Sequence, residues 1–225
     1  MQALIIGATG LVGSHLLRQV LEDERFSGVT VLTRRTTGIS HPKLTEHIVD
    51  FADSEGWKAL VKGDVLYLCL GTTRAKAGGK KAQYAVDHTC QNHVAKAAVQ
   101  NGTPDLVLVS SAGADAQARF FYLRMKGELE EDLRTLDFRK RIFVRPGSLD
   151  GPRKEKRTME RIGIFGLRAM NKIGLMRSMR PIHAETVARA MVNATFATPD
   201  GTSIHELEEV FKLALDDDFP PQASP

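Results

Sequence analysis

The chain has 225 residues, of which 42% are hydrophobic, with a formal net charge of +4 and a pI of about 9.1. This length suits a single α/β domain with one sizeable core, and the mildly basic balance favours anionic ligands without requiring nucleic acid. Only Cys69 and Cys90 occur, which predicts neither a disulfide framework nor a metal cluster. No apolar run reaches membrane-spanning length and the first strand starts almost at Met1, so we expect a soluble cytoplasmic protein without a membrane span.

The first thirteen residues, MQALIIGATGLVG, predict a strand, a glycine turn and a helix in that order. Such a turn brings backbone N–H groups and the positive end of a helix up to a pyrophosphate, which a Cβ at the approach point would block. Gly7 would allow the tight turn, Gly10 the close approach of the ligand, and Gly13 the packing of helix on strand. The sequence therefore predicts a dinucleotide site that includes Gly7, Thr9, Gly10, Leu11, Val12 and Gly13.

A second strand is predicted over residues 28–33, and it ends where dinucleotide enzymes choose between NAD and NADP. NAD enzymes commonly carry an acid at this point, whereas this chain carries Arg34 and Arg35. Two guanidiniums can hold a 2'-phosphate by charge-assisted hydrogen bonds, which predicts NADP(H) as the cofactor. The alternative is that both arginines are solvated surface residues.

Two further strands precede polar or glycine-containing turns. Residues 44–51 predict a third strand ending near Asp50, whose carboxylate could cap the short helix that includes Trp57. Residues 64–70 form an almost continuous apolar run, which is typical of a central parallel strand buried on both faces. Residues 71–73 (GTT) follow this strand, and ligands bind beyond the carboxyl ends of such strands, so we expect them to face the cofactor.

The middle of the chain leads to another strand end with polar side chains. The basic, glycine-rich residues 74–81 predict a loop, and residues 82–100 predict one long helix. A buried strand over residues 106–109 then runs directly into Ser110 and Ser111. A serine hydrolase would need GxSxG around its nucleophile, and that pattern is absent here.

A helix that begins near Phe121 carries Tyr122 and Lys126. A spacing of four puts both side chains on one face, where the ammonium can stabilise a phenolate and reach ribose hydroxyls. YxxxK alone is a weak signal, but here it follows a strand that ends in serine, in a chain that opens with GxxGxxG. We therefore predict that Tyr122 and Lys126 are catalytic. The alternative is a partly buried tyrosine beside a surface lysine.

The last third of the chain predicts a strand over residues 141–144 and a substrate-side segment over residues 147–182. Between residues 153 and 180, basic and apolar residues alternate, which indicates an amphipathic helix that caps the domain, covers the substrate site or lies on an anionic surface. A helix, a short strand and a final helix complete one domain over residues 1–215. The charged, proline-containing tail, residues 216–225, is predicted to be disordered.

Six motifs appear in a characteristic order: GATGLVG at 7–13, Arg34 at a strand end, CLGTT at 69–73, SSAGAD at 110–115, YLRMKGELE at 122–130 and RPGSLDGPR at 145–153. From Met1 to about Ala190, the chain resembles an extended or atypical short-chain dehydrogenase/reductase, of the group related to the Tat-interacting tumour-suppressor protein and its bacterial homologues. The resemblance implies a Rossmann-type, doubly wound parallel sheet in three α/β/α layers, with a small C-terminal substrate-side insertion and an NADP(H) cofactor.

The resemblance also implies roles for individual residues. Tyr122 would be the general acid or base, Lys126 would orient the ribose, and a serine would polarise the substrate oxygen. Asp50 would lie near the adenine, and this role and the capping role both stay open. The other residues implied at the cofactor are Phe51, Leu70, Gly71, Thr72, Thr73, Pro146, Tyr122 and Lys126.

Three features depart from the family's pattern or leave an alternative open. The catalytic serine is Ser110, which the strand end favours, or Ser111, which the superfamily pattern favours. Asp87 stands where many relatives have Asn, which puts an Asn-assisted proton relay in doubt. The residues after Lys126 are too few for the large nucleotide-sugar domain of many extended relatives, so an epimerase or dehydratase is less expected.

These observations predict an NADP-dependent oxidoreductase that transfers hydride between nicotinamide and a small carbonyl or alcohol substrate. The alternative is a regulatory protein that binds NADPH and reports its level to a protein partner without turnover. Nucleic-acid binding through residues 153–180 is not predicted, because interleaved aromatic residues are too few there. A small-molecule substrate is the expected partner, and a protein partner or a homodimer stays open.

Overall fold

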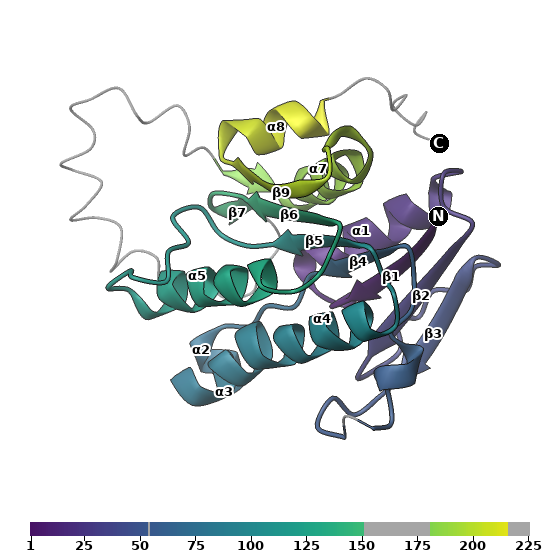
Figure 1. The fold of residues 1–225 in the computed structure, drawn as a ribbon, viewed down its shortest axis with the longest axis horizontal. Helices are drawn as coiled ribbons and strands as arrows, with labels where there is room; N and C mark the ends of the chain where they lie inside the picture. The colour runs from purple at the N-terminus through teal and green to yellow at the C-terminus, as the bar shows by residue number, and fades with distance from the viewer. Residues whose placement is uncertain (54, 151–180, 216–225) are drawn as a thin grey trace.

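The computed structural model describes residues 1–53, 55–150 and 181–215. A seven-stranded sheet runs through them in the order β3-β2-β1-β4-β5-β6-β9, with every neighbouring pair parallel. Its strands are β1 (Gln2–Ile6), β2 (Gly28–Thr33), β3 (Leu44–Ile48), β4 (Val65–Leu68), β5 (Asp105–Val109), β6 (Lys140–Arg145) and β9 (Gly201–Glu206). This strand order is that of a doubly wound Rossmann fold, so the predicted fold class is confirmed (Figure 1).

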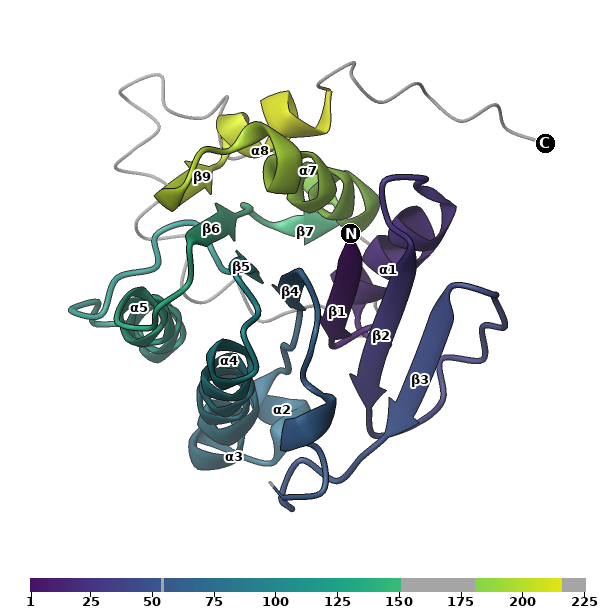
Figure 2. The same ribbon diagram turned by 45° about the vertical axis from the view of Figure 1, so that its right-hand side comes forward.

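Helices cover both faces of the sheet and give the molecule three layers (Figure 2). One face carries α1 (Leu11–Glu22), α7 (Ala184–Ala197) and α8 (Glu208–Ala214), and the other carries α4 (Gln91–Gln100) and α5 (Phe121–Arg134). Successive strand residues point to opposite faces, so Ile5 packs in the core beside α1 and Leu4 in the core beside α4. Strands buried on both faces explain the continuous apolar runs in the sequence.

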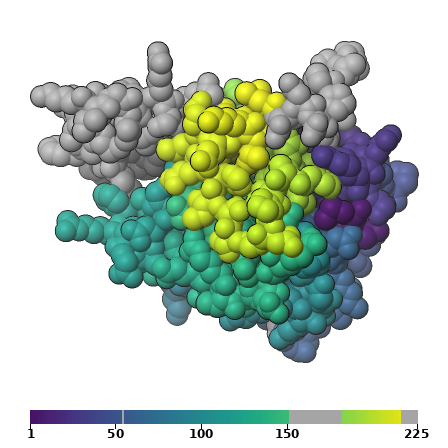
Figure 3. Space-filling model, turned by 45° about the horizontal axis from the view of Figure 1, so that its top comes forward, coloured from purple at the N-terminus to yellow at the C-terminus, as the bar shows by residue number. Residues whose placement is uncertain are grey.

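Helix α7, near the C-terminus, packs against elements from the beginning of the chain. It packs against α1, and its Thr195 hydroxyl lies 2.7 Å from the buried hydroxyl of Tyr67 on β4. The carbonyl of Thr195 accepts a hydrogen bond of 3.0 Å from the ammonium of Lys140. Figure 3 shows the yellow and light green C-terminal residues between the purple N-terminal residues and the teal middle of the chain. The helices in the described ranges include none long and apolar enough to cross a membrane.

Two predicted segments differ from the structure. Strand β3 ends at Ile48, two residues before Asp50. Residues 74–81, predicted as a loop, contain α2 (Arg74–Ala77) and the start of α3 (Lys80–Tyr84). The sequence did hold a signal for α2, because Thr73 is a residue type that often caps the start of a helix. In the structure its hydroxyl accepts a hydrogen bond from the amide of Lys76 at 3.2 Å.

The long helix predicted over residues 82–100 is not uniform. It consists of the end of α3, a π-helical segment η2 (Ala85–Cys90), and α4. Farther along the chain, a small second sheet pairs β7 (Leu149–Asp150) with β8 (Ile182–His183). These strands lie at the two ends of the predicted substrate-side segment. The predicted amphipathic helix over residues 153–180 and the tail over residues 216–225 lie outside the described residues.

Candidate functional site

The carboxyl ends of the parallel strands lie along one edge of the sheet, and the predicted site residues follow these ends. The strand order changes direction between β1 and β4, because the chain continues from β1 to β2 on one side and later crosses to β4 on the other. Ligands of open α/β sheets bind in the crevice at such a switch point. The fold therefore places the glycine turn after β1 at the centre of the candidate site.

The glycine turn is too tight for side chains at two of its positions. Gly7 has a φ of +92°, and a Cβ added to it would lie 2.6 Å from the carbonyl carbon of Cys69. A Cβ on Gly13 would lie 2.2 Å from the carbonyl oxygen of Gly7. The amide of Gly10 donates a 2.9 Å hydrogen bond to that same oxygen. The backbone thus has the tight turn predicted at Gly7 and the close packing of helix on strand predicted at Gly13.

The turn leads into the amino end of α1 at the carboxyl edge of the sheet. The first bond of this helix runs from the amide of Ser14 to the carbonyl of Gly10 at 3.0 Å, so the amides of Leu11, Val12 and Gly13 precede it. Such amides have no partner inside the helix, and together with the positive end of the helix they can bind phosphate. Thr9 is exposed in the turn, whereas the side chain of Val12 is buried and leaves only its backbone for a ligand.

Arg34 and Arg35 are exposed at the end of β2. No described residue forms a hydrogen bond or an ion pair with either guanidinium, so both can receive a phosphate. On the neighbouring strand β3, the carboxylate of Glu46 accepts hydrogen bonds from the amide of Thr37 at 2.8 Å and from its hydroxyl at 2.5 Å. These bonds to Thr37 engage one carboxylate oxygen of Glu46, the acid on the strand next to β2.

Asp50 has a different local role from the predicted cap. Its carboxylate accepts a hydrogen bond from the amide of Ala52 at 2.9 Å and closes a turn. The short 3-10 helix η1 (Lys58–Leu60) begins after Trp57 and has no side-chain cap, so the predicted capping by Asp50 is wrong. Phe51 is partly buried and packs near the ring of Trp57, with centroids 5.8 Å apart.

The turn after β4 lies against the glycine turn, because Gly7 contacts the backbone of Cys69 and Leu70. Gly71, Thr72 and Thr73 continue from there along the edge. Gly71 is exposed, and Thr72 is half-buried with its amide donating a 2.7 Å hydrogen bond to the carboxylate of Asp87.

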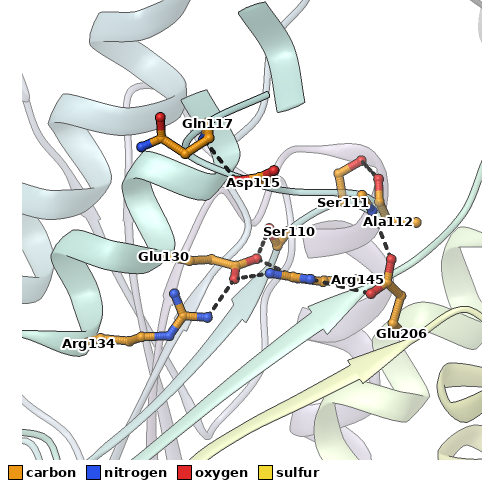
Figure 4. A network of polar contacts seen from close by, with 10 residues as sticks. Ser110, Ser111, Ala112, Asp115, Gln117, Glu130, Arg134, Arg145 and Glu206 are labelled. Carbon is orange, nitrogen blue, oxygen red and sulfur yellow. Dashed lines mark hydrogen bonds and ion pairs between the residues drawn. The ribbon is translucent and has the colours of Figure 1, made fainter. Parts of the chain in front are cut away.

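The two serines after β5 differ in their surroundings. Ser110 is buried, and its hydroxyl donates a 2.6 Å hydrogen bond to Glu130. Ser111 is half-buried, and its hydroxyl has a longer contact of 3.3 Å with the carbonyl of Ala112. Figure 4 shows Ser110 within the cluster around Glu130 and Ser111 outside it. The carbonyl of Pro146, at the end of β6, accepts from the amide of Ala112 at 3.0 Å and holds this turn in place.

A charged network next to these serines joins α5, β6, β9 and the turn after β5 (Figure 4). The carboxylate of Glu130 on α5 is fully buried and accepts two hydrogen bonds from Arg145, at 2.9 and 2.7 Å, and one from Arg134 at 3.2 Å. Arg145 also contacts Glu206 at the end of β9 at 3.3 Å, and Glu206 accepts from the amide of Gly113 at 2.8 Å. The hydrogen bonds with Glu130 hold the pKa of the Arg145 guanidinium above its ordinary value.

Tyr122 and Lys126 lie four residues apart on α5, as predicted, and Tyr122 is half-buried. Lys126 is only 3% exposed, yet no described residue forms a hydrogen bond or an ion pair with its ammonium. Burial raises the pKa of the Cys69 thiol to about 12, and the Lys126 ammonium opposes that shift.

Gly127 lets α5 approach the turn that follows the serines. A Cβ at this position would lie 2.2 Å from the backbone of both Asp115 and Ala116. The amide of Asp115 also donates a 3.2 Å hydrogen bond to the carbonyl of Leu123. These contacts connect the serine turn directly to the helix that carries Tyr122 and Lys126.

Comparison with known proteins agrees with this geometry. The family described as NAD(P)H-binding matches residues 7–197, from the glycine turn to the end of α7. The chain belongs to this NAD(P)H-binding family. The family match begins at Gly7, the first residue of the tight turn in which Gly7 and Gly13 leave no space for a side chain. NAD(P)H-binding is thus consistent with the residues at the edge.

Relatives within this NAD(P)H-binding family include mitochondrial proteins of fungi. The mitochondrial protein fmp52 of Aspergillus fumigatus is 38% identical over 208 residues, which cover 88% of each chain. The mitochondrial protein FMP52 of Saccharomyces cerevisiae is 42% identical over 157 residues, which cover 68% of each chain. These names contradict the predicted cytoplasmic location. That prediction rested on cysteine usage, which does not separate the cytoplasm from a mitochondrial compartment.

Solved structures show the same fold. A short-chain dehydrogenase/reductase superfamily protein from Agrobacterium tumefaciens with bound NAD has a TM-score of 0.69 at 13% identity, covering 92% of this chain and 77% of that one. UDP-glucose 4-epimerase from Thermotoga maritima has a TM-score of 0.66 at 15% identity, covering 95% of this chain and 81% of the epimerase. At these identities the likeness shows the fold and leaves the substrate open.

The sequence did not reveal three parts of this NAD(P)H-binding protein's site. Glu130 follows Lys126 by four residues, so a charged residue on the inner face of the helix was a usable signal. Glu206 and Gly127 gave no comparable signal, because their contacts depend on how distant segments pack.

Proposed function

We propose that this protein is an NADP(H)-dependent oxidoreductase that transfers hydride between nicotinamide and a small carbonyl or alcohol substrate. The resemblance to the Tat-interacting tumour-suppressor protein group belongs to the same proposal. The observation that carries it is Lys126, a residue only 3% exposed, which lies one helical turn after the half-buried Tyr122 and whose ammonium forms no hydrogen bond or ion pair with the described residues. A buried charge of this kind is costly unless a ligand or a catalytic phenol compensates it.

Each proposed catalytic group has one task. The cofactor, when bound, supplies or accepts the hydride. In the direction of reduction, the Tyr122 hydroxyl donates a proton to the carbonyl oxygen as its carbon accepts hydride, which gives an alcohol. Lys126 stabilises the phenolate that remains and binds the ribose hydroxyls. Ser111 donates a hydrogen bond to the same substrate oxygen, where negative charge develops.

Ser111 is proposed in this role because Ser110 has another one. The Ser110 hydroxyl donates a 2.6 Å hydrogen bond to the buried carboxylate of Glu130, so it is not available as a donor to a substrate oxygen. The Ser111 hydroxyl has only a weak internal contact at 3.3 Å and lies in the half-buried turn at the edge. For the cofactor, Arg34 and Arg35 are the proposed ligands of the 2'-phosphate.

A screen of aldehydes and ketones with the purified full chain and NADPH tests this function, with loss of the absorbance of reduced nicotinamide as the signal. On any substrate found, Tyr122→Phe is expected to lower turnover about 100-fold or more, because the proton donor is lost while the ring remains. Tyr67→Phe is the matched control, since it removes a phenol hydroxyl that bonds to Thr195 in the core. Full turnover of Tyr122→Phe would refute the catalytic assignment.

The same screen separates the regulatory alternative. A protein that binds NADPH, reduces none of the substrates and changes its affinity for a protein partner on binding would be a sensor and not an oxidoreductase. A chain that binds neither NADPH nor NADH would contradict both functions.

A further inference from the structure

The helical stretch next to the candidate site contains an unusual turn. Between α3 and α4, residues 85–90 form the π-helical segment η2. Such segments are rare and occur frequently at functional sites, because the wider turn re-aims side chains. Here the side-chain amide of Gln91 donates a 2.6 Å hydrogen bond to the carbonyl of Asp87, and both residues are almost completely buried. The carbonyl of Asp87 in the π-helical segment is thus bound by a buried side chain from the first residue of α4.

Two side chains from this region hold the backbone of a single residue on the sheet edge. The carboxylate of Asp87 accepts the amide of Thr72 at 2.7 Å, and the side-chain amide of Gln83 donates to the carbonyl of Thr72 at 3.2 Å. Asp87 is 1% and Gln83 6% exposed. Both polar groups of the Thr72 backbone are therefore bound by buried side chains that lie four residues apart.

Thr72 lies on a defined side of the switch point. The arginines that follow β2 are on the adenosine side, where a 2'-phosphate would bind. The turn after β4 is on the opposite side of the glycine turn, in the direction of β5 and the serines. A dinucleotide that crosses the crevice therefore passes the Thr72 turn with its nicotinamide half.

We propose that Asp87 and Gln83 are positioning residues that hold the Thr72 turn in the shape that binds the nicotinamide half of the cofactor. This inference rests on the proposed NADP(H) function. It gives Asp87 a task that differs from an Asn-assisted proton relay, because a carboxylate oxygen accepts the Thr72 amide in the structure. An Asn at this position could accept the same hydrogen bond with its carbonyl oxygen.

Binding measurements on two nucleotides test this positioning role. NADPH spans the whole crevice, whereas 2',5'-ADP contains only the adenosine half with its 2'-phosphate. Asp87→Ala is expected to raise the Kd of NADPH about 10-fold and to leave the Kd of 2',5'-ADP within about 2-fold. Asp87→Asn is expected to restore the Kd of NADPH to within about 3-fold of the wild-type value, because the acceptor is retained.

Gln83→Ala tests the same role independently. It is expected to raise the Kd of NADPH about 3-fold and to leave the Kd of 2',5'-ADP unchanged. The double variant of Gln83 and Asp87 should weaken NADPH by less than the product of the two single effects, because both side chains hold one peptide. Asn92→Ala is the matched control. Asn92 is a buried polar residue on α4, but its side chain donates to Asp132 on α5 at 2.6 Å.

Several outcomes would overturn the inference. One is an unchanged Kd of NADPH in Asp87→Ala and Gln83→Ala, and another is an equal weakening of NADPH and 2',5'-ADP, which would indicate a general loss of structure. Failure of Asp87→Asn to rescue binding would also contradict it. If Asp87→Ala does not fold, Gln83→Ala and Asp87→Asn decide the question by the same criteria. A wild-type chain that binds neither nucleotide would overturn the proposed function as well, whereas normal wild-type binding with unaffected variants would overturn only this inference.

Discussion

The two halves of the sheet edge are built in different ways. Around β1, β2 and β4, the backbone forms the candidate site: no side chain fits at Gly7 or Gly13, and the first amides of α1 have no partner inside the helix. Around β5, β6 and β9, buried charged side chains make it, with Glu130 and Arg145 at the centre. We call these the glycine half and the ionic half.

The two halves differ in the contacts that stabilise them. In the glycine half, one short segment supplies the whole turn, and its contacts are backbone contacts within seven residues or with the adjacent strand end. In the ionic half, most hydrogen bonds join separate elements, such as Ser110 to Glu130 or Gly113 to Glu206. Replacing residues of the ionic half should therefore mainly lower the free energy of unfolding. Replacing polar residues of the glycine half should mainly weaken ligand binding.

The largest effect is expected for Glu130→Ala. This change leaves the half-buried Arg145 without its main partner and Ser110 without an acceptor. Loss of one member of a buried ion pair costs about 3–5 kcal/mol in the free energy of unfolding, which urea denaturation can measure. Glu128→Ala is the control on the same helix, because its pair with Arg124 at 3.8 Å is partly exposed and is worth less than about 1 kcal/mol. Equal losses in the two variants would remove the distinction between the halves.

A smaller effect, on binding only, is expected for Arg34→Ala in the glycine half. Loss of one charge-assisted contact to the 2'-phosphate corresponds to about 10-fold to 150-fold in the Kd of NADPH. The Kd of NADH and the free energy of unfolding should stay nearly constant, because Arg34 is exposed and has no described partner. Calorimetric titration of both cofactors measures this, with Arg18→Ala on the exposed face of α1 as a control. Equal weakening of NADPH and NADH would mean that Arg34 does not bind the 2'-phosphate.

The same contrast explains what could be predicted from the sequence. The glycine half depends on local order, so a strand, three glycines and a helix were enough to predict its geometry, and the arginines after β2 followed from strand counting. The ionic half depends on contacts between residues far apart in the chain, such as Arg145 with Glu206. Neither these contacts nor the π-helical segment near Asp87 leaves a periodic pattern, because tertiary packing determines both.

The choice between the two serines also needed the structure. In the sequence, Ser110 and Ser111 are adjacent and chemically identical, and a strand end alone does not say which hydroxyl faces the core. Both serines follow the end of β5, and the buried acceptor Glu130 binds the hydroxyl of Ser110, whereas the hydroxyl of Ser111 contacts the carbonyl of Ala112. The distinction therefore comes from a residue on another element.

The smallest change in the free energy of unfolding is expected for substitutions of the two serines, which should differ in their effects on stability and turnover. Ser110→Ala should lower the free energy of unfolding by about 1 kcal/mol, because Glu130 loses one neutral donor and keeps Arg145 and Arg134. Turnover on a confirmed substrate should stay within about 3-fold, since the lost hydroxyl faces the buried network. Ser111→Ala is the matched variant: its stability should not change, whereas its turnover should fall about 100-fold, as expected for a lost donor to the substrate oxygen. Unfolding curves and initial rates of both variants test this pair, and a reversed pattern would assign the catalytic hydroxyl to Ser110. In that case the hydrogen bond to Glu130 would have to open during the reaction, and the ionic half would be part of the chemistry.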